Sequence, residues 1–135
     1  MNGGAVIEFS LDSRSGVAPY LQVAQQVRQA LRLGLLREGD QLPTVKDVVA
    51  SLAINPNTVL KAYKELERDG LVAARQGIGT FVTATPSVAP PAALAPLRRD
   101  LRRWLAKARR AGLDDEAIEA LVASTLRLEG QVGIA

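Results

Sequence analysis

The pattern of apolar and polar positions near the start of the chain has a two-residue period. In VIEFSLD, Ile7, Phe9 and Leu11 alternate with polar neighbours, which is typical of a short, half-buried strand. SRSG follows as a turn, and the period then changes. From Pro19, apolar side chains recur at intervals of three and four residues until Gly34 and the stretch LLREGDQLP end the pattern. The sequence therefore predicts a short strand followed by an amphipathic helix.

Two further helices are predicted in close succession. Thr44 can cap a short helix, with Asp47 three residues on as its capping-box partner. Asn55 can cap the next helix, which would run from Pro56 to about Asp69 with its proline at the first helical position. Only a tight turn fits between the two. Two helices joined in this way are typical of a helix-turn-helix.

A predicted β-hairpin follows the third helix directly. Two β-prone runs, residues 71–74 and 80–83, flank the glycine-rich stretch 75–79 in GLVAARQGIGTFVTA. A hairpin placed immediately after a helix-turn-helix is typical of the winged form of that motif. We therefore expect a mainly α fold with a small β-hairpin, in which residues 1–85 form a winged helix-turn-helix domain.

The composition changes after this domain. Residues 86–96 are rich in Pro and Ala and are expected to form an extended, semi-rigid linker. Helical patterns then lie on either side of Gly112, and Asp114 can cap the second. This αα-hairpin, residues 97–129, is too small to bury its apolar faces alone, so it needs the first domain or a second copy of itself. The residues assigned to dimerisation are Leu97, Leu101, Trp104, Leu105, Ile118, Leu121 and Val122.

The first of these C-terminal helices is also crowded with positive charge. Seven Lys and Arg residues lie between positions 98 and 110, with Asp100 the one acid among them. The favoured interpretation is a solvated outer face on a dimerisation helix, whose aliphatic stems cover apolar surface. Added phosphate contact, or attraction to another anionic partner, is the alternative.

The composition of the 135 residues excludes several classes of chemistry. There is no cysteine and no histidine, so disulfides and thiol chemistry are ruled out and the commonest general base is missing. The sequence shows no pair of carboxylates placed for catalysis, so the protein is not expected to be an enzyme. Neither a metal site nor a cofactor is predicted. The N-terminus lacks the features of a signal peptide, and no apolar run is long enough to span a bilayer. We therefore expect a cytoplasmic protein without membrane association.

The candidate chemistry lies on the exposed face of the third helix. The formal net charge of +3 and the pI of about 9.7 agree with an anionic partner but do not require one. Asparagine can bind adenine bidentately in the major groove, and a helix N-terminus offers free N–H groups to phosphate. The alternative to a DNA-binding face is a well-capped helix whose charged face is simply solvated. The cation, amide and glycines at the tip of the following hairpin favour DNA binding over that alternative. The exposed face carries Asn57, Lys61, Lys64 and Arg68.

Four pieces of the sequence occur in a characteristic order between residues 19 and 82: PYLQVAQQVRQAL, GDQLP, NPNTVLKAYKELERDGLV and GIGTFV. In combination they resemble the DNA-binding domain of GntR-type bacterial transcription regulators. The two-helix tail, with no room for a larger effector domain, resembles the YtrA subfamily. The resemblance implies a homodimer that binds a roughly two-fold operator, usually as a repressor.

The resemblance also implies roles for single residues. Lys46 stands where the family commonly has arginine, so a bidentate contact becomes a single-point contact. Thr44 stands where the family has serine. The remaining candidates lie at the tips of the recognition helix and of the wing. The full set of predicted DNA-binding residues is Thr44, Lys46, Asn55, Asn57, Thr58, Lys61, Lys64, Arg75, Gln76 and Gly77.

The predicted function is sequence-specific binding of double-stranded DNA by a dimeric transcription regulator, through the helix at 56–69 and the wing at 75–79. A winged helix can instead bind protein or RNA. The Asn, Thr and Lys residues on the exposed helix face favour a duplex groove, because a protein-binding face should be apolar or aromatic. Whether a small effector molecule binds between the helix pairs of a dimer is left open by the sequence, as are the operator and the sign of regulation.

Overall fold

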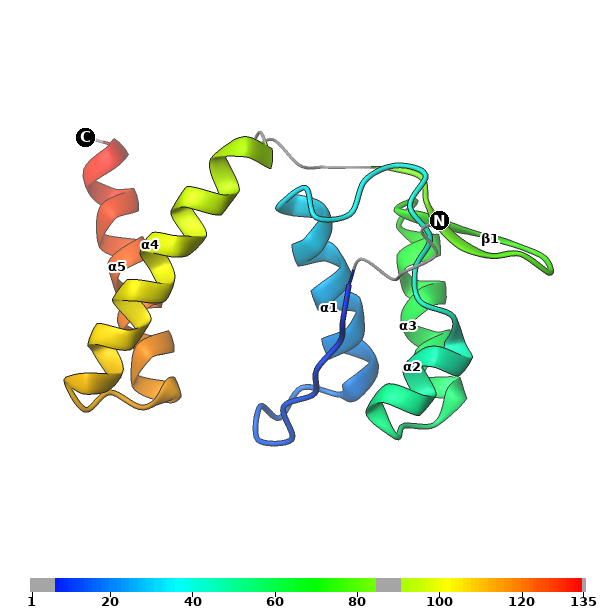
Figure 1. Ribbon diagram of the computed structural model, residues 1–135, viewed down its shortest axis with the longest axis horizontal. Coiled ribbons are helices and arrows are strands. Elements are labelled where there is room, and N and C mark those ends of the chain that lie inside the picture. Colours follow the sequence, from blue (N-terminus) through cyan, green and yellow to red (C-terminus); the bar gives the residue numbers. More distant parts are fainter. Residues whose placement is uncertain (1–6, 85–90, 135) are drawn as a thin grey trace. The chain divides into compact units, whose positions relative to one another are not determined.

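The computed structural model describes residues 7–84 and 91–134, and it divides the chain into two compact units, Met1–Pro91 and Ala92–Ala135. The first unit contains three helices and a two-stranded antiparallel sheet, and the second contains two helices (Figure 1). The predicted fold class is therefore confirmed. The elements are α1 (Pro19–Arg32), α2 (Val45–Leu52), α3 (Pro56–Arg68), β1 (Val72–Arg75), β2 (Gly79–Val82), α4 (Pro91–Arg110) and α5 (Asp115–Ile134).

One apolar core holds the first unit together. The apolar stripes of α1 and α3 face one another in this core, and α2 and the sheet close it at its sides. The hydroxyl of Tyr63 donates a 2.6 Å hydrogen bond to the carbonyl oxygen of Pro43, which ties α3 to the segment before α2. The largest of the fully buried side chains are Val23, Val27, Leu31, Leu36, Leu42, Val59, Leu66, Val72 and Val82.

The predicted N-terminal caps of α2 and α3 are confirmed. Thr44 Oγ1 accepts from the backbone N–H of Asp47 at 3.1 Å, which caps α2. Asn55 Oδ1 accepts from the backbone N–H of Asn57 at 2.8 Å, which caps α3. Between the helices, Ala53 adopts the left-handed conformation with φ of 55°, and this single residue makes the turn tight.

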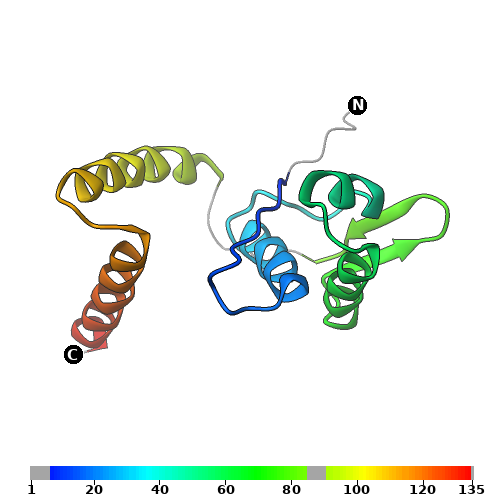
Figure 2. The same cartoon turned by 90° about the horizontal axis from the view of Figure 1, so that it is seen from below.

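The predicted N-terminal strand is wrong. Phe9 is buried as the alternation requires, but residues 7–12 form no β-ladder within the described part of the chain. The segment runs along α1 instead (Figures 1 and 2). Side-chain amides of α1 take the place of a partner strand, because Gln26 bonds both the N–H and the C=O of Ser10, and Gln22 does the same for Asp12.

The hairpin forms as predicted, with a third segment beside it. Val72 pairs with Val82 and Arg75 with Gly79, so the tip is residues 76–78. Residues 39–42 run along the other edge of β2 and exchange three backbone hydrogen bonds with it, of 2.8–2.9 Å. The hairpin projects from the helices as a narrow arm (Figures 1 and 2), and this extra pairing braces its base.

The predicted linker is wrong for residues 91–96, and its residues 86–90 lie outside the described part of the chain. Helix α4 begins at Pro91, where a fixed φ suits a first helical position, and continues through three alanines, the best helix formers. Pro96 in the second turn forgoes one backbone hydrogen bond without ending the helix. The αα-hairpin is therefore longer than the expected range 97–129 at both ends.

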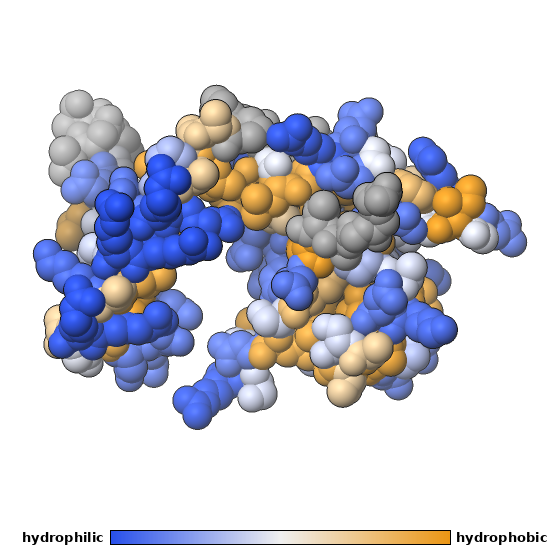
Figure 3. Space-filling view, viewed as in Figure 1, coloured by the Kyte–Doolittle hydropathy of each residue, from blue (hydrophilic) through white to orange (hydrophobic). Residues whose placement is uncertain are grey.

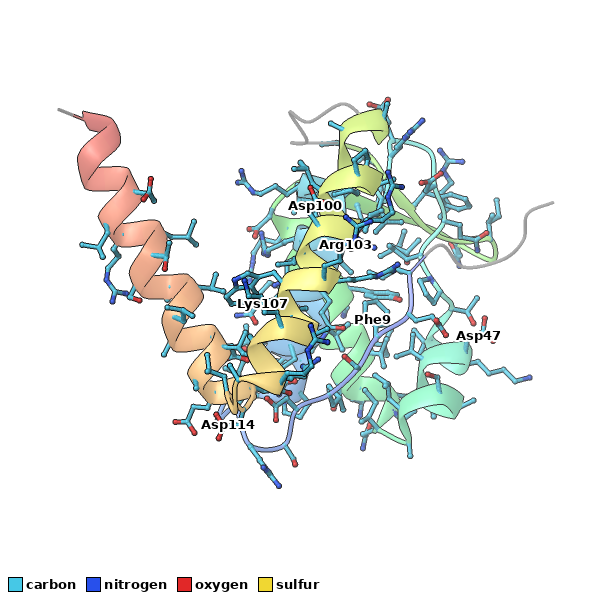
Figure 4. All side chains as sticks on the ribbon, turned by 60° about the vertical axis from the view of Figure 1, so that its left-hand side comes forward. Phe9, Asp47, Asp100, Arg103, Lys107 and Asp114 are labelled. Carbon is cyan, nitrogen blue, oxygen red and sulfur yellow. The ribbon has the colours of Figure 1, made fainter. Side chains whose placement is uncertain are left out.

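The second unit is an open V. Helices α4 and α5 meet at the turn around Gly112 and diverge from it (Figures 2 and 4). Asp114 Oδ1 accepts from the backbone N–H of Ala117 at 2.9 Å and caps α5, as predicted. Ala108 and Ile118, close to the turn, are buried. Farther along both helices, the apolar side chains on the inner faces are exposed.

Candidate nucleic-acid interface

The outer face of α3 carries a shallow groove of about 360 Å³. Its lining contains all four residues that the sequence assigned to the exposed face of this helix, together with one leucine and one glutamate. The face is polar and cationic while the opposite face of α3 is buried in the core. The lining residues are Asn57, Leu60, Lys61, Lys64, Glu65 and Arg68.

The three polar residues at the start of α3 have different roles. The side-chain oxygen of Asn55 is engaged in the cap, which leaves its amide NH₂ available to a ligand. Thr58 is half-buried, and its backbone N–H bonds the carbonyl of Asn55 at 3.0 Å. Asn57 is exposed and lines the groove. Of the three, Asn57 is therefore the best placed to contact a base edge.

Lys61 is held by an aromatic residue of another helix. Its Nζ lies 4.0 Å from the centroid of the Tyr20 ring at the start of α1, which is a cation–π contact. Tyr20 belongs to the helical pattern that begins at Pro19, and no local pattern in the sequence signals a contact between helices so far apart in the chain. Lys64 is exposed, whereas Arg68 at the other end of the groove is paired with Glu65 at 2.7 Å.

The first turn of α2 contributes two further candidates. Thr44 and Lys46 are both exposed. The hydroxyl of Thr44 accepts the capping hydrogen bond, so its own proton remains available to a phosphate. Lys46 extends from the first turn of α2, a helix N-terminus whose free N–H groups also favour an anion.

The wing presents its cation in a fixed position. The guanidinium of Arg75 stacks 4.6 Å from the centroid of the Phe81 ring on β2. Gln76 and Gly77 at the tip are exposed, and Gly77 has φ of 75°, which a residue with a side chain rarely adopts. At the base of the tip, the side-chain amide of Gln41 donates to the carbonyl of Ile78 at 3.2 Å. Gln41 was not anticipated as a support for the wing.

The residues predicted to dimerise divide according to their distance from the turn of the V. Ile118 is buried within the helix pair, and Trp104 and Leu105 are half-buried. The other four, Leu97, Leu101, Leu121 and Val122, are 40–64% exposed. Trp104, Leu101, Leu121 and Val122 line one apolar groove of about 440 Å³ together with Thr125 and Leu126.

Residues 7–84 and 91–134 offer neither a metal centre nor a membrane span. Among them, no cluster of three or more acidic side chains could hold a metal ion. No described helix combines the length and the apolar character that crossing a bilayer requires.

Comparison with known proteins identifies the family. The model of the family described as bacterial regulatory proteins, gntR family, matches residues 19–82, which begin with α1 and end with β2. The HTH-type transcriptional repressor YtrA of Bacillus subtilis (strain 168) is 32% identical over 111 residues, which are 82% of this chain and 85% of YtrA. That similarity covers both units.

Two solved structures are also similar. A crystal structure of a transcriptional antiterminator from Listeria monocytogenes EGD-e matches with a TM-score of 0.56 and 29% identity over 90% of this chain and 91% of that one. The AraR DNA-binding domain in complex with operator ORX1 matches with a TM-score of 0.51 and 24% identity over 57% of this chain and 96% of that domain, which shows a shared fold. The chain belongs to the GntR family of bacterial regulatory proteins and is a DNA-binding transcription regulator, not an enzyme.

Proposed function

We propose that the chain is a dimeric repressor that reads a two-fold operator with α3 and the wing of each copy. The observation that carries the proposal is the polar, cationic groove on α3, which begins at the capped N-terminus of that helix. In a helix-turn-helix, the N-terminal residues of the second helix contact base edges in the major groove. The name of the relative YtrA, a transcriptional repressor, supports repression as the direction of control.

The geometry supports a proposed role for each residue of the interface. Asn57 is proposed to contact a base, because it is exposed and free of the cap. Lys46, Lys61 and Lys64 are proposed to contact DNA phosphates beside the major groove. Thr44, Asn55 and Thr58 are proposed to fix the helix tips against the sugar-phosphate backbone of the DNA. Arg75, Gln76 and Gly77 are proposed to bring the wing to a neighbouring groove. We expect the protein to act in the cytoplasm, because the bacterial chromosome lies there.

The open V supports a second copy of the chain as the occupant of its inner face. Exposure of the apolar side chains rises away from the turn, to 64% at Leu97 and 67% at Leu126. A helix pair of this size is not stable with both apolar faces in water. Because the faces of two identical V-shaped pairs match one another, a two-fold dimer would bury both sets and form a four-helix arrangement.

The first experiment is in-vitro selection from random duplexes at about 150 mM salt, followed by titration against scrambled DNA. Enrichment of an inverted repeat, bound about 10³-fold or more above scrambled sequence, is the expected result. Weak binding without any enriched sequence would contradict the proposal, because only the phosphate contribution would then be present.

The dimer has its own experiment. Val122→Arg places a charge on the inner face of the V, where Val122 is 40% exposed, so the isolated helix pair tolerates it while a packed dimer does not. Sedimentation equilibrium should show a dimer for the parent chain and a monomer for the variant. The control is Ala123→Arg, at a neighbouring exposed position that does not line the groove, which should remain dimeric. A monomeric parent would overturn the dimer.

A further inference from the structure

The face of α4 opposite its apolar side chains is basic along its length. Leu97, Leu101 and Ala108 share one side of the helix, and at about 100° per residue Arg99, Arg103 and Arg110 project from the opposite side. Figure 3 shows hydrophilic side chains gathered over α4, and Figure 4 shows Asp100, Arg103 and Lys107 following one another along it. The proposed dimer uses the apolar side and leaves this basic face outward.

The nearby carboxylates neutralise only part of this face. Arg109 pairs with Asp115 at 2.7 Å, and Arg103 pairs with Asp100 at 3.6 Å. Within the described part of the chain, no carboxylate oxygen lies within 4 Å of Arg98, Arg99 or Arg102. The acids that open α5 follow the turn, beside the C-terminal end of α4, as Figure 4 shows for Asp114.

The helix dipole explains the cations at the C-terminal end of α4 but not those in its middle. Lys107, Arg109 and Arg110 lie in the last turn, where the helix dipole favours positive charge. The middle of the helix, where residues 98–103 lie, gains nothing from the dipole, because that effect is confined to the terminal turns. There, Arg98 and Arg102, and likewise Arg99 and Arg103, are like-charge pairs four residues apart, which destabilise a helix by about 0.2–0.5 kcal/mol per pair. An anionic partner would remove that repulsion.

We propose that Arg98, Arg99, Arg102 and Arg103 bind the phosphates of duplex DNA beside the site occupied by α3 and the wing. The guanidinium group matches phosphate bidentately, and the duplex carries one charge per about 1.7 Å of its axis. Six residues, 85–90, connect the two described segments, and the seven Cα–Cα steps from residue 84 to residue 91 span at most about 25 Å. Each copy that binds DNA therefore carries this basic face within reach of flanking phosphates.

Two other partners fit the charge less well. A helix that lies on an anionic membrane inserts its apolar side, which would turn Arg99, Arg103 and Arg110 away from the lipid. The acidic side chains of a second copy could pair with Arg109, but Arg109 already forms a salt bridge with Asp115. The proposal rests on DNA binding by the first unit and does not depend on the dimer.

The experiment compares two quadruple variants of the full chain that remove the same charge. R98Q/R99Q/R102Q/R103Q removes the proposed contacts, and R14Q/R32Q/R37Q/R127Q removes four exposed arginines elsewhere. Affinity for a long random-sequence duplex is measured by fluorescence anisotropy between about 50 and 200 mM salt. The first variant should reduce the magnitude of the negative slope of log K against log[salt], by at most about 3.6, because each of four lost phosphate contacts contributes about 0.9. The slope of the control variant should stay closer to the slope of the parent chain.

Every outcome decides the proposal. Equal slopes for the two quadruple variants would overturn it, because net charge alone would then explain the effect. If the parent chain does not bind the duplex at low salt, both this proposal and the proposed function are overturned. If the parent chain binds and the first variant has the same slope as the parent, only this proposal is overturned. Circular dichroism checks that both variants remain folded. Loss of binding to phosphatidylserine vesicles, or of the dimer in sedimentation equilibrium, with DNA affinity unchanged, would assign the arginines to those partners and overturn the phosphate contact.

Discussion

Gln26 on α1 holds Ser10 as a neighbouring β-strand would, accepting from its backbone N–H at 3.0 Å and donating to its carbonyl at 2.7 Å. Gln22, one helical turn earlier, does the same for Asp12 at 2.7 and 3.0 Å. The two amides differ in exposure, because Gln22 is 8% exposed and the bonds of Gln26 lie at the surface.

The first prediction uses that difference in exposure. Gln22→Leu should lower the free energy of unfolding by about 1–3 kcal/mol, because it leaves partly buried backbone groups of Asp12 unpaired. Gln26→Leu should cost less, about 0.5–1 kcal/mol, because water can replace its bonds to Ser10. Urea denaturation of both variants measures the two costs. Equal losses would contradict this account of the segment.

The second prediction separates the cap of α3 from DNA contact. Asn55→Ala should lower the free energy of unfolding by about 1 kcal/mol, because the N–H of Asn57 loses its acceptor. Asn57→Ala should leave stability within about 0.5 kcal/mol and weaken binding to the selected operator by about 1–3 kcal/mol. Asn55→Asp is the control for stability alone, since a carboxylate keeps the cap. Stability measured by urea denaturation should therefore respond to Asn55→Ala but not to Asn57→Ala, whereas Asn57→Ala should change only the affinity measured by anisotropy.

The third prediction concerns the ring beneath Lys61. Tyr20→Leu should weaken DNA binding a few-fold, because the cation–π contact that holds the ammonium contributes about 0.5–1 kcal/mol. Tyr20→Phe keeps the ring and should bind like the parent chain. In a background that already carries Lys61→Ala, the leucine variant should have no further effect on affinity. Additive effects in this double-mutant cycle would show that Tyr20 does not act through Lys61.

The fourth prediction tests the base of the wing. Gly79 has φ of 146°, and a Cβ there would lie 2.3 Å from Nε2 of Gln41. Gly79→Ala should therefore displace Gln41 from the carbonyl of Ile78 and strain the backbone, at a cost of about 1–3 kcal/mol in unfolding free energy. Adding Gln41→Ala should restore only the steric part of that loss. Full recovery in the double variant would mean that the backbone conformation is not strained.

The fifth prediction is a dependence of stability on alkaline pH. Burial raises the pKa of the Tyr63 hydroxyl well above its usual range, and the nearby Asp47 carboxylate adds to the rise. Because the folded-state pKa is the higher one, the unfolded chain loses this proton first. The contribution of Tyr63 to stability is therefore complete below about pH 10 and falls as the pH rises beyond it.

Tyr63→Phe isolates that contribution. At neutral pH, it should cost about 1–3 kcal/mol, because the buried carbonyl of Pro43 loses its donor. The difference in unfolding free energy between the parent chain and the variant, measured by urea denaturation, should shrink as the pH rises above about 10. A difference that stays constant to about pH 11 would mean that the phenol titrates normally in the folded protein.

Features encoded within a few residues could be predicted from the sequence. Thr44 and Asn55 cap their helices through side chains that reach two or three residues along the chain, so a local pattern was sufficient. The exposed face of α3 followed equally from its period. The bounds of both strands lay within one residue of the prediction, because β-prone runs on both sides of the glycines defined them.

Features that depend on distant partners could not be predicted. The alternation of Ile7, Phe9 and Leu11 marks which side is buried, but it does not distinguish a partner strand from glutamine side chains on a helix. Nothing in the sequence GDQL indicates that residues 39–42 pair with β2. The contact between Lys61 and Tyr20 likewise depends on two different helices. Pro91 and Pro96 favoured a linker because proline usually ends helices, whereas the alanines between them outweighed that tendency.

The open V of α4 and α5 has a consequence for the response of the proposed repressor to its own abundance. If the inner faces are completed only by another chain, the form that recognises a two-fold operator increases with the square of the protein concentration at low levels. Promoter output would then change more steeply with the amount of protein than it would for a monomeric binder. Residues along the inner face, such as Leu101 and Val122, would set the concentration at which this transition occurs, without touching DNA.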